Sequence, residues 1–335
     1  MSDSRISTDI DYDRDGKQVG YLNVPNSTNE SGWGTLLMPI AVVKNGRGPT
    51  ILFTGGNHGD EYEGPIALMK LLRALEPAEV KGRVVIVPGL NMPALMAGQR
   101  LSPIDGMNMN RAFPGARRGT ITAMIAHYVQ TQLLPLADFV CDIHSGGRSM
   151  SFLPSAVVHR LDDADRMRKT LDAARAFGAP VGLVLKELDA EGMLDTAAED
   201  MGRIFISTEI GGAGVVSPAT IKVAETGARN LLVHFGICQG NLVTREAQGL
   251  TPTRLMAVPD GDCYTAATEN GVYEPLVDIG ETVTVGQRLG QVHDIERPGE
   301  PPAEKRAKRD GLLVCRLGPG RVRRGDTIAV IAVDL

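Results

Sequence analysis

Apolar runs alternate with amphipathic stretches from about residue 20 to residue 237. The first two predicted strands, 20–24 and 34–43, are separated by polar Gly, Ser and Asn residues. Further strands are predicted at 50–56, 83–91, 138–147, 181–187 and 203–212, and helices at 64–75, 121–137, 161–178 and 217–237. Continuous apolar runs are typical of strands buried on both faces, and strands that alternate with helices indicate a parallel arrangement. The pattern therefore predicts an α/β domain with a mainly parallel sheet.

The pattern changes after about residue 250, where the helical periodicity fades. Short Val- and Ile-rich segments alternate with glycine turns in two similar blocks, 270–295 and 310–333. Turn signals at such short spacing favour an all-β fold. We therefore expect two domains, an α/β domain over 1–248 and a β-rich domain over 249–335 built from two related halves. The charged, proline-rich linker 296–309 between the halves is expected to be exposed.

Composition narrows the function classes. The net charge of −5 and the aromatic content of 4% argue against a nucleic-acid partner. No run approaches the ~20 apolar residues of a membrane span, and the polar N-terminus has no apolar segment of a secretory signal. The four cysteines are far apart and lack zinc-ribbon spacing. We therefore expect free thiols and a cytoplasmic protein with no membrane partner.

Three predicted strand ends carry residues that could bind a metal or move a proton. His58 and Glu61 lie just past the strand 50–56, His144 lies at the end of the strand in 138–147, and Glu209 lies at the end of the strand in 203–212. Two histidines and one carboxylate are typical ligands of catalytic zinc, which lowers the pKa of a bound water toward ~7. This predicts one Zn²⁺ per chain, with Glu209 as the base that takes the proton of the water. Asp142 is expected on the same strand face as His144, where it could orient that ligand.

The segment 97–115 supplies candidate substrate contacts. It follows a buried strand and contains Asn110 and Arg111, with Arg100 upstream. A guanidinium binds a carboxylate through a planar fork, and a second one can stabilise a developing oxyanion. The alternative at this point is an ordinary surface loop that happens to contain arginines.

Four motifs in order, GGNHGDEYEG, NMNRAFPG, DIHSGG and STEIGG, resemble the succinylglutamate desuccinylase/aspartoacylase family of zinc amidohydrolases. The likeness covers most of residues 20–240 and extends to the β-rich tail. It implies a zinc-carboxypeptidase-like fold, with a mixed, mainly parallel sheet flanked by helices. The tail resembles the barrel-sandwich hybrid of biotinyl and lipoyl domains. Because it lacks their Met-Lys-Met hairpin, no attached cofactor is expected.

The resemblance implies a role for each matching position. The positions that match the family's zinc ligands are His58, Glu61 and His144. Glu209 matches the carboxylate that activates water and then protonates the leaving amine. Arg111, with Asn110 beside it, matches the pair that holds the substrate carboxylate, and Arg100 matches the arginine that polarises the scissile carbonyl. The family also has a tyrosine near the site, which this sequence does not let us place.

Within the family the chain looks most like the bacterial deacetylases of ectoine breakdown. This implies a small-molecule partner, an N-acyl amino acid, and deacetylation of N-alpha-acetyl-L-2,4-diaminobutyrate. Open alternatives are another acylamino-acid amidohydrolase of the succinylglutamate or acetylaspartate type, a metallocarboxypeptidase, and a non-enzymatic ligand-binding or carrier protein. A hydrolase with Ser145 or Cys141 as nucleophile is a weaker alternative, since no G-x-S-x-G elbow is present. A homodimer is suggested by the family resemblance alone.

Overall fold

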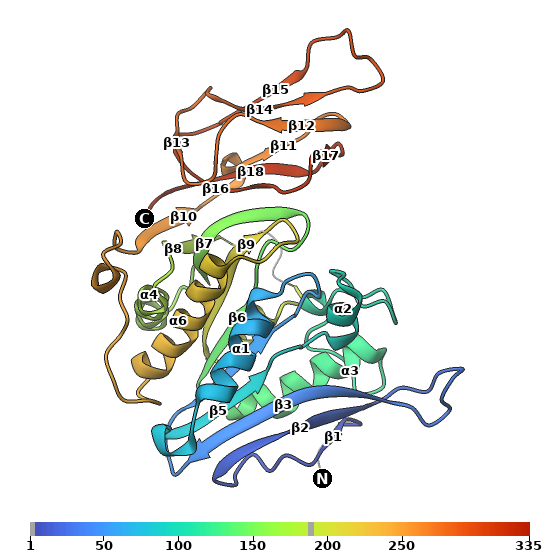
Figure 1. Ribbon diagram of the computed structural model, residues 1–335, viewed down its shortest axis with the longest axis vertical. Helices are drawn as coiled ribbons and strands as arrows, with labels where there is room; N and C mark the ends of the chain where they lie inside the picture. Colours follow the sequence, from blue (N-terminus) through green and yellow to red (C-terminus); the bar gives the residue numbers. More distant parts are fainter. Residues whose placement is uncertain (1–3, 187–190) are drawn as a thin grey trace.

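A computed structural model describes residues 4–186 and 191–335 of the chain. A long mixed sheet runs through the molecule, with the strand order β1-β2-β3-β5-β4-β6-β9-β7-β8-β10-β18-β16-β13 (Figure 1). A smaller sheet in the C-terminal region has the order β15-β14-β12-β17. Within the described residues, none of the helices has the length and apolarity needed to span a bilayer.

The elements have the following bounds. The helices are α1 (Glu63–Ala74), α2 (Met92–Ala97), α3 (Ile121–Tyr128), α4 (Ala164–Phe177), α5 (Leu194–Asp200) and α6 (Pro218–His234). The strands up to the last helix are β1 (Ser7–Thr8), β2 (Gly16–Pro25), β3 (Thr35–Asn45), β4 (Thr50–Gly55), β5 (Gly82–Val87), β6 (Phe139–Ile143), β7 (Met150–His159), β8 (Val181–Leu185) and β9 (Ile204–Gly212). The later strands are β10 (Arg254–Val258), β11 (Tyr264–Ala266), β12 (Gly271–Pro275), β13 (Thr282–Val283), β14 (Arg288–His293), β15 (Ala303–Arg306), β16 (Gly311–Leu317), β17 (Arg321–Val322) and β18 (Thr327–Asp334).

The strands and helices predicted before residue 240 are confirmed, with shifts at their ends. The predicted helix 121–137 is α3 followed by a π-helical turn, Val129–Leu133, and a 3₁₀ turn, Leu134–Leu136. Glu187, the last residue of the predicted strand 181–187, lies outside the described residues, as does the very start of the polar N-terminus. Strand β7 and the short helices α2 and α5 were not predicted.

The sheet is mixed in direction. Strands β5, β4, β6 and β9 are parallel neighbours, and so are β7, β8 and β10. The two parallel groups meet where β7 runs antiparallel to β9, and β1, β2 and β3 add an antiparallel edge next to β5. The predicted parallel arrangement is therefore found in these two groups of strands, in the middle of the sheet, and the strands at both edges are antiparallel.

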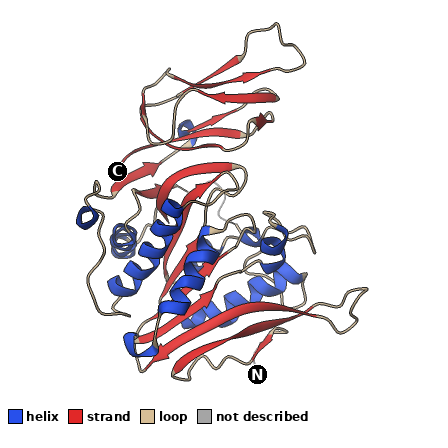
Figure 2. Ribbon diagram, in the orientation of Figure 1, coloured by secondary structure: helices blue, strands red, loops and turns tan. Residues whose placement is uncertain are grey.

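Helices cover both faces of this part of the sheet (Figures 1 and 2). One apolar cluster joins the sheet to α3 and α5 and includes Leu52, Met124 and Leu194. A second cluster on the other face joins it to α1, α4 and α6 and includes Phe53 and Phe177. The central strands are therefore buried on both faces, which accounts for their continuous apolar sequences.

The C-terminal region consists mainly of strands and loops (Figure 2). The two blocks seen in the sequence exchange strands, because β12 of the first pairs with β17 of the second, and β16 of the second pairs with β13 of the first. The linker 296–309 is largely exposed, but it includes β15, and Lys305 within that strand is buried. Strands β10, β16 and β18 join this region to β7 and β8 in the long sheet.

The strand register brings the candidate chemistry to one edge. Gly55 at the end of β4 is level with Ile143 at the end of β6, so the residues that follow both strands lie close together. The hydroxyl of Thr208 in β9 accepts a hydrogen bond from the backbone N–H of His144 (3.1 Å) and donates to its carbonyl (2.9 Å). Glu209 therefore follows directly from a residue tied to His144.

Helix α1 starts close above these strand ends because its second residue is glycine. A Cβ added to Gly64 would lie 2.5 Å from the carbonyl oxygen of Ile143 and 3.0 Å from its Cβ. Any side chain here would push the start of α1, and with it Glu61, away from β6.

We predict that Gly64→Ala destabilises the protein by about 1–3 kcal/mol through this overpacking, although Ala is intrinsically the better helix former. The free energy of unfolding from denaturant titration measures the effect. Gly299→Ala is the matched control, since its added Cβ meets no atom within 4 Å. Equal stability of the two variants would show that the close approach of α1 to β6 is not a constraint.

Candidate active site

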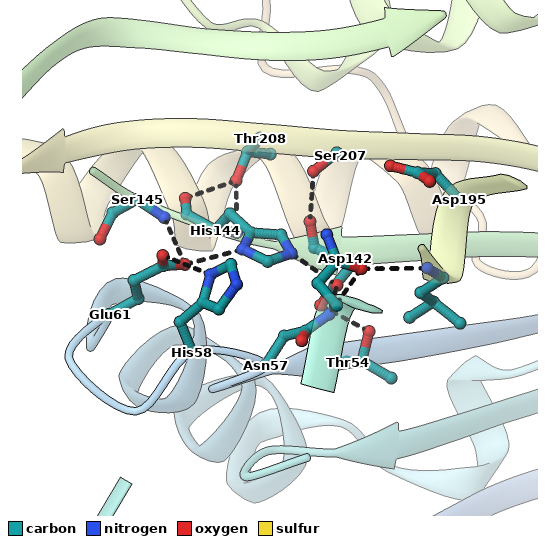
Figure 3. Close-up of polar contacts among 12 residues, drawn as sticks. Thr54, Asn57, His58, Glu61, Asp142, His144, Ser145, Asp195, Ser207 and Thr208 are labelled. Atoms are coloured by element: carbon teal, nitrogen blue, oxygen red, sulfur yellow. Dashed lines mark hydrogen bonds and ion pairs between the residues drawn. The ribbon is translucent and has the colours of Figure 1, made fainter. Parts of the chain in front are cut away.

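Three buried side chains from different segments meet at the edge described above. His58 and Glu61 come from the loop between β4 and α1, and His144 directly follows β6 (Figure 3). Each offers one ligand atom such that all of these atoms lie within 4.8 Å of one another. The structure thus brings together the three residues that the sequence nominated as metal ligands.

The hydrogen bonds around the two histidines fix which ring nitrogen carries a hydrogen. Nε2 of His58 lies 3.1 Å from Oδ1 of Asn108, an oxygen that also accepts the backbone N–H of Asn110. Nε2 of His144 lies 2.7 Å from a carboxylate oxygen of Asp142. Both partners are acceptors, so each Nε2 must donate, and in the neutral ring each Nδ1 then presents a lone pair.

The two Nδ1 atoms face the same carboxylate. Oε1 of Glu61 lies 2.7 Å from Nδ1 of His58, and Oε2 lies 2.7 Å from Nδ1 of His144. Lone pairs on nitrogen and oxygen at such distances repel unless a proton or a cation lies between them. Two imidazoles and one carboxylate are a ligand set suited to Zn²⁺, so the donors present fit a bound metal ion.

The charges in the site shift one another's pKa values. Burial alone would raise the pKa of Glu61, but neighbouring His144 and His58 outweigh burial and hold it well below its usual range. Burial alone would lower the pKa of His144, whereas the carboxylates of Asp142 and Glu61 raise it well above the ordinary value. The pKa of His58 is lowered, mainly by burial. The site therefore concentrates negative charge at Glu61, where a cation would be stabilised.

Asp142 lies where the sequence placed it, on the same side of β6 as His144 (Figure 3). Besides His144, its carboxylate accepts hydrogen bonds from the hydroxyl of Thr54 (2.7 Å) and from Nδ2 of Asn57 (2.8 Å). A carboxylate held by such a network fixes the orientation and tautomer of the imidazole it binds.

A cavity of about 620 Å³ opens beside the three residues. Apart from them, its polar and charged lining comprises Arg100, Asn110, Arg111, Ser145, Ser149, His159, Lys186, Asp195, Ser207, Glu209 and Tyr264. Every candidate catalytic and substrate residue from the sequence, other than Asp142 behind His144, therefore lines one cavity.

Glu209 reaches this cavity from β9. Burial and the nearby Glu61 carboxylate raise the pKa of Glu209 well above its ordinary value. Its Oε2 atom is buried and has no hydrogen-bond partner among the described residues. A carboxyl group whose proton affinity is raised in this way is suited to accept and return a proton.

The two arginines differ in their surroundings. Nη1 of Arg100 lies 3.2 Å from Nδ1 of His58 and 3.6 Å from Oε1 of Glu61, directly beside the ligand atoms. Arg111 has an exposed side chain whose Nη1 donates to the carbonyl of Asn110 (2.6 Å). The amide oxygen of Asn110 accepts the backbone N–H of Leu194 at 3.0 Å, which ties this loop to the start of α5.

Several lining residues were missed by sequence reasoning. Tyr264 and Val330 come from the C-terminal region, and His159 and Asp195 come from the unpredicted elements β7 and α5. Among the described residues, Tyr264 is a tyrosine that lines the cavity, and no motif marks it in the sequence. The candidate residues were predicted from their positions at the ends of expected parallel strands, and none of these four residues lies at such a position.

The alternative nucleophiles are poorly placed for covalent catalysis. All four cysteines are free and buried, as expected. Burial raises the pKa of Cys141 well above that of an ordinary thiol, which disfavours the thiolate. Ser145 lines the cavity, but its side chain forms a hydrogen bond with Glu63 and its backbone N–H donates to Glu61 at 3.2 Å.

Comparisons with known proteins show the family of the chain. Residues 47–235 match the model of the succinylglutamate desuccinylase/aspartoacylase catalytic domain. An N-alpha-acetyl-L-2,4-diaminobutyric acid deacetylase from Halomonas elongata is 47% identical, over 98% of this chain and 95% of that protein.

Solved structures show the same relationship. The product-bound ectoine utilization protein EutE (DoeB) from Ruegeria pomeroyi has a TM-score of 0.95 at 44% identity, over 98% of this chain and 99% of the other. A succinylglutamate desuccinylase/aspartoacylase from Rhodobacter sphaeroides has a TM-score of 0.95 at 44% identity, over 99% of both chains. The chain therefore belongs to the succinylglutamate desuccinylase/aspartoacylase family of amidohydrolases.

Proposed function

We propose that the chain is a zinc-dependent amidohydrolase that removes the acetyl group of N-alpha-acetyl-L-2,4-diaminobutyrate. One observation carries the proposal of a metal-assisted hydrolysis. The Nδ1 atoms of His58 and His144 face the Glu61 carboxylate in the cavity that Glu209 also lines. This arrangement combines a three-residue cation site with a separate carboxyl group that is able to move a proton.

The proposed zinc would be held by His58, Glu61 and His144. When bound, Zn²⁺ acidifies a water molecule and polarises the carbonyl of the scissile amide. Asp142 and Asn108 hold the far nitrogens of the two imidazoles, so both Nδ1 lone pairs would be available to a metal ion.

Glu209 is proposed to move the protons of the reaction. It takes a proton from the attacking water, and it returns that proton to the amine as the amide bond breaks. The lack of a hydrogen-bond partner for Oε2 among the described residues supports this role, because a carboxyl fully bound by the protein would exchange protons less readily.

The cationic and amide side chains are proposed to bind the substrate. Arg111, with Asn110 beside it, holds the carboxylate of the amino acid, which places the amide at the catalytic groups. Arg100 stabilises the negative charge that develops on the carbonyl oxygen. Its guanidinium already lies within 4 Å of Glu61 and His58, next to the ligand atoms.

The identity of the substrate is supported by the relatives. The Halomonas elongata protein is named for deacetylation of N-alpha-acetyl-L-2,4-diaminobutyric acid, and the Ruegeria pomeroyi protein for ectoine utilization. The high identity over nearly the full length favours the same reaction for this chain, in ectoine catabolism.

We propose a zinc-carboxypeptidase-like core over 1–248 and a barrel-sandwich-like domain over 249–335. The exchanged strands of the two C-terminal blocks support the second assignment. We also propose that the protein is a homodimer, which the family resemblance supports, and that it is cytoplasmic, which the composition supports.

We predict that Glu209→Gln lowers kcat about 10²- to 10⁴-fold, because the amide cannot accept the proton of the water. The variant should keep its zinc, since Glu209 lies outside the ligand set. Steady-state kinetics and metal analysis by plasma mass spectrometry test both statements. Full activity in the metal-loaded variant would remove Glu209 from the mechanism.

We predict that N-alpha-acetyl-diaminobutyrate is hydrolysed faster than N-acetylaspartate, succinylglutamate or a panel of peptides, and that a chelator abolishes this turnover. Added Zn²⁺ should restore it. A preference for peptides would indicate a carboxypeptidase, and turnover that persists after chelation would exclude the metal mechanism.

We predict that Arg111→Gln raises KM for the acetylated amino acid at least ~10-fold, because a charge-assisted contact to the substrate carboxylate is lost. Arg118→Gln is the control, since Arg118 is an exposed arginine of the same loop outside the cavity lining. Initial rates over a range of substrate concentrations measure the change. Equal KM values for the two variants would count against the proposed contact.

A further inference from the structure

Among the described residues that line the cavity, one carboxylate is not used by the proposed reaction. The acidic lining residues of the cavity are Glu61, Glu209 and Asp195. The first belongs to the metal site and the second to proton transfer, so Asp195 has no part in the chemistry proposed above. In the view of Figure 3, Asp195 and Glu61 lie on opposite sides of His144.

Asp195 is buried yet incompletely satisfied. The exposed fraction of Asp195 is 8%. Oδ1 accepts the backbone N–H (2.6 Å) and the hydroxyl (3.3 Å) of Thr196. Oδ2 lies 3.6 Å from Nε2 of His159, longer than a hydrogen bond, and accepts none from the described part of the chain. Because Asp195 lines the cavity, an oxygen in this state can accept a hydrogen bond from a cationic ligand there.

Neighbouring residues hold Asp195 in place. Nδ1 of His159 lies 3.0 Å from a carboxylate oxygen of Glu199, one turn further along α5. The imidazole therefore packs against two acidic residues of the same helix. The shorter contact of His159 is to Glu199 and the longer one, 3.6 Å, is to Asp195, so the imidazole restrains the Asp195 side chain without forming a hydrogen bond to its Oδ2.

Asp195 also lies next to the proposed carboxylate-binding residues. The backbone N–H of Leu194, the preceding residue, donates to Oδ1 of Asn110 at 3.0 Å. Asn110 is in turn followed by Arg111. A short amino acid whose carboxylate is bound by Arg111 would therefore have a side-chain ammonium group within reach of the start of α5.

We propose that Asp195 is a specificity-determining residue that binds the side-chain ammonium group of the acylated amino acid. This inference rests on the proposed function and deepens it. The same carboxylate disfavours substrates with acidic side chains, such as N-acetylaspartate, by repulsion between like charges. Lys186 also lines the cavity, so the selection depends on direct contact with Asp195 rather than on the overall charge.

The test compares two substrates that differ only in the ammonium group, N-alpha-acetyl-L-2,4-diaminobutyrate and N-acetyl-L-2-aminobutyrate. The wild-type enzyme should show at least ~10-fold higher kcat/KM for the first, because a buried charged hydrogen bond is lost with the second. Asp195→Asn should lower kcat/KM for the first at least ~10-fold and leave the second within about 3-fold. Asp200→Asn, an exposed residue at the end of the same helix, is the control and should change neither.

The possible results distinguish a specificity role of Asp195 from a structural role. Equal losses on both substrates in Asp195→Asn would assign the residue a structural role and overturn the inference. Equal kcat/KM of the wild-type enzyme for both substrates would overturn it even if the variant failed to fold, while acylamino-acid hydrolysis would still stand. If the wild-type enzyme hydrolysed neither substrate, the proposed function itself would fail.

Discussion

The site depends on one electrostatic constraint, the carboxylate of Glu61 held against two imidazole nitrogens in a buried environment. Both Nδ1 atoms lie 2.7 Å from its oxygens, and hydrogen bonds to Asp142 and Asn108 direct the protons to the opposite ring nitrogens. Buried groups of this kind are costly unless a positive charge joins them. A divalent ion meets that requirement, so metal binding would also stabilise the native fold.

The fold meets this constraint through strand register and one glycine. Strands β4 and β6 end level with each other, and Thr208 ties His144 to β9, the strand that carries Glu209. Gly64 allows α1 to start against β6 and so keeps Glu61 between the histidines. The C-terminal region closes the cavity with Tyr264 and Val330. The candidate site residues therefore lie at strand ends and in the loop after β4, while the wall of the cavity comes partly from the later strands.

Elements whose position depends on a single local pattern could be predicted from the sequence. Continuous apolar runs identified the strands buried on both faces, and the rule that chemistry follows strand ends selected His58, His144 and Glu209, which the structure brings to one cavity. Strand β7 was missed because Pro154 argues against a central strand. The structure accommodates that proline at a register shift between Phe152 and Ser155.

Other features could not have been predicted because they depend on tertiary contacts. Helix α5 has seven residues and no side-chain cap at its start, so neither periodicity nor a capping signal marks it. Asp195 lies at the cavity at the start of that helix, where Asn110, far away in the sequence, accepts a hydrogen bond from the preceding residue. Tyr264 reaches it because β11 pairs with β18, far along the chain. Contacts between distant segments leave no local pattern.

Anomalous diffraction from crystals of the purified protein, recorded on both sides of the zinc absorption edge, tests the central claim most directly. One peak should lie among His58, Glu61 and His144, within about 2.0–2.2 Å of both Nδ1 atoms and of a Glu61 oxygen. A peak bound instead through the Nε2 atoms, or no peak at this position in fully active protein, would contradict the account.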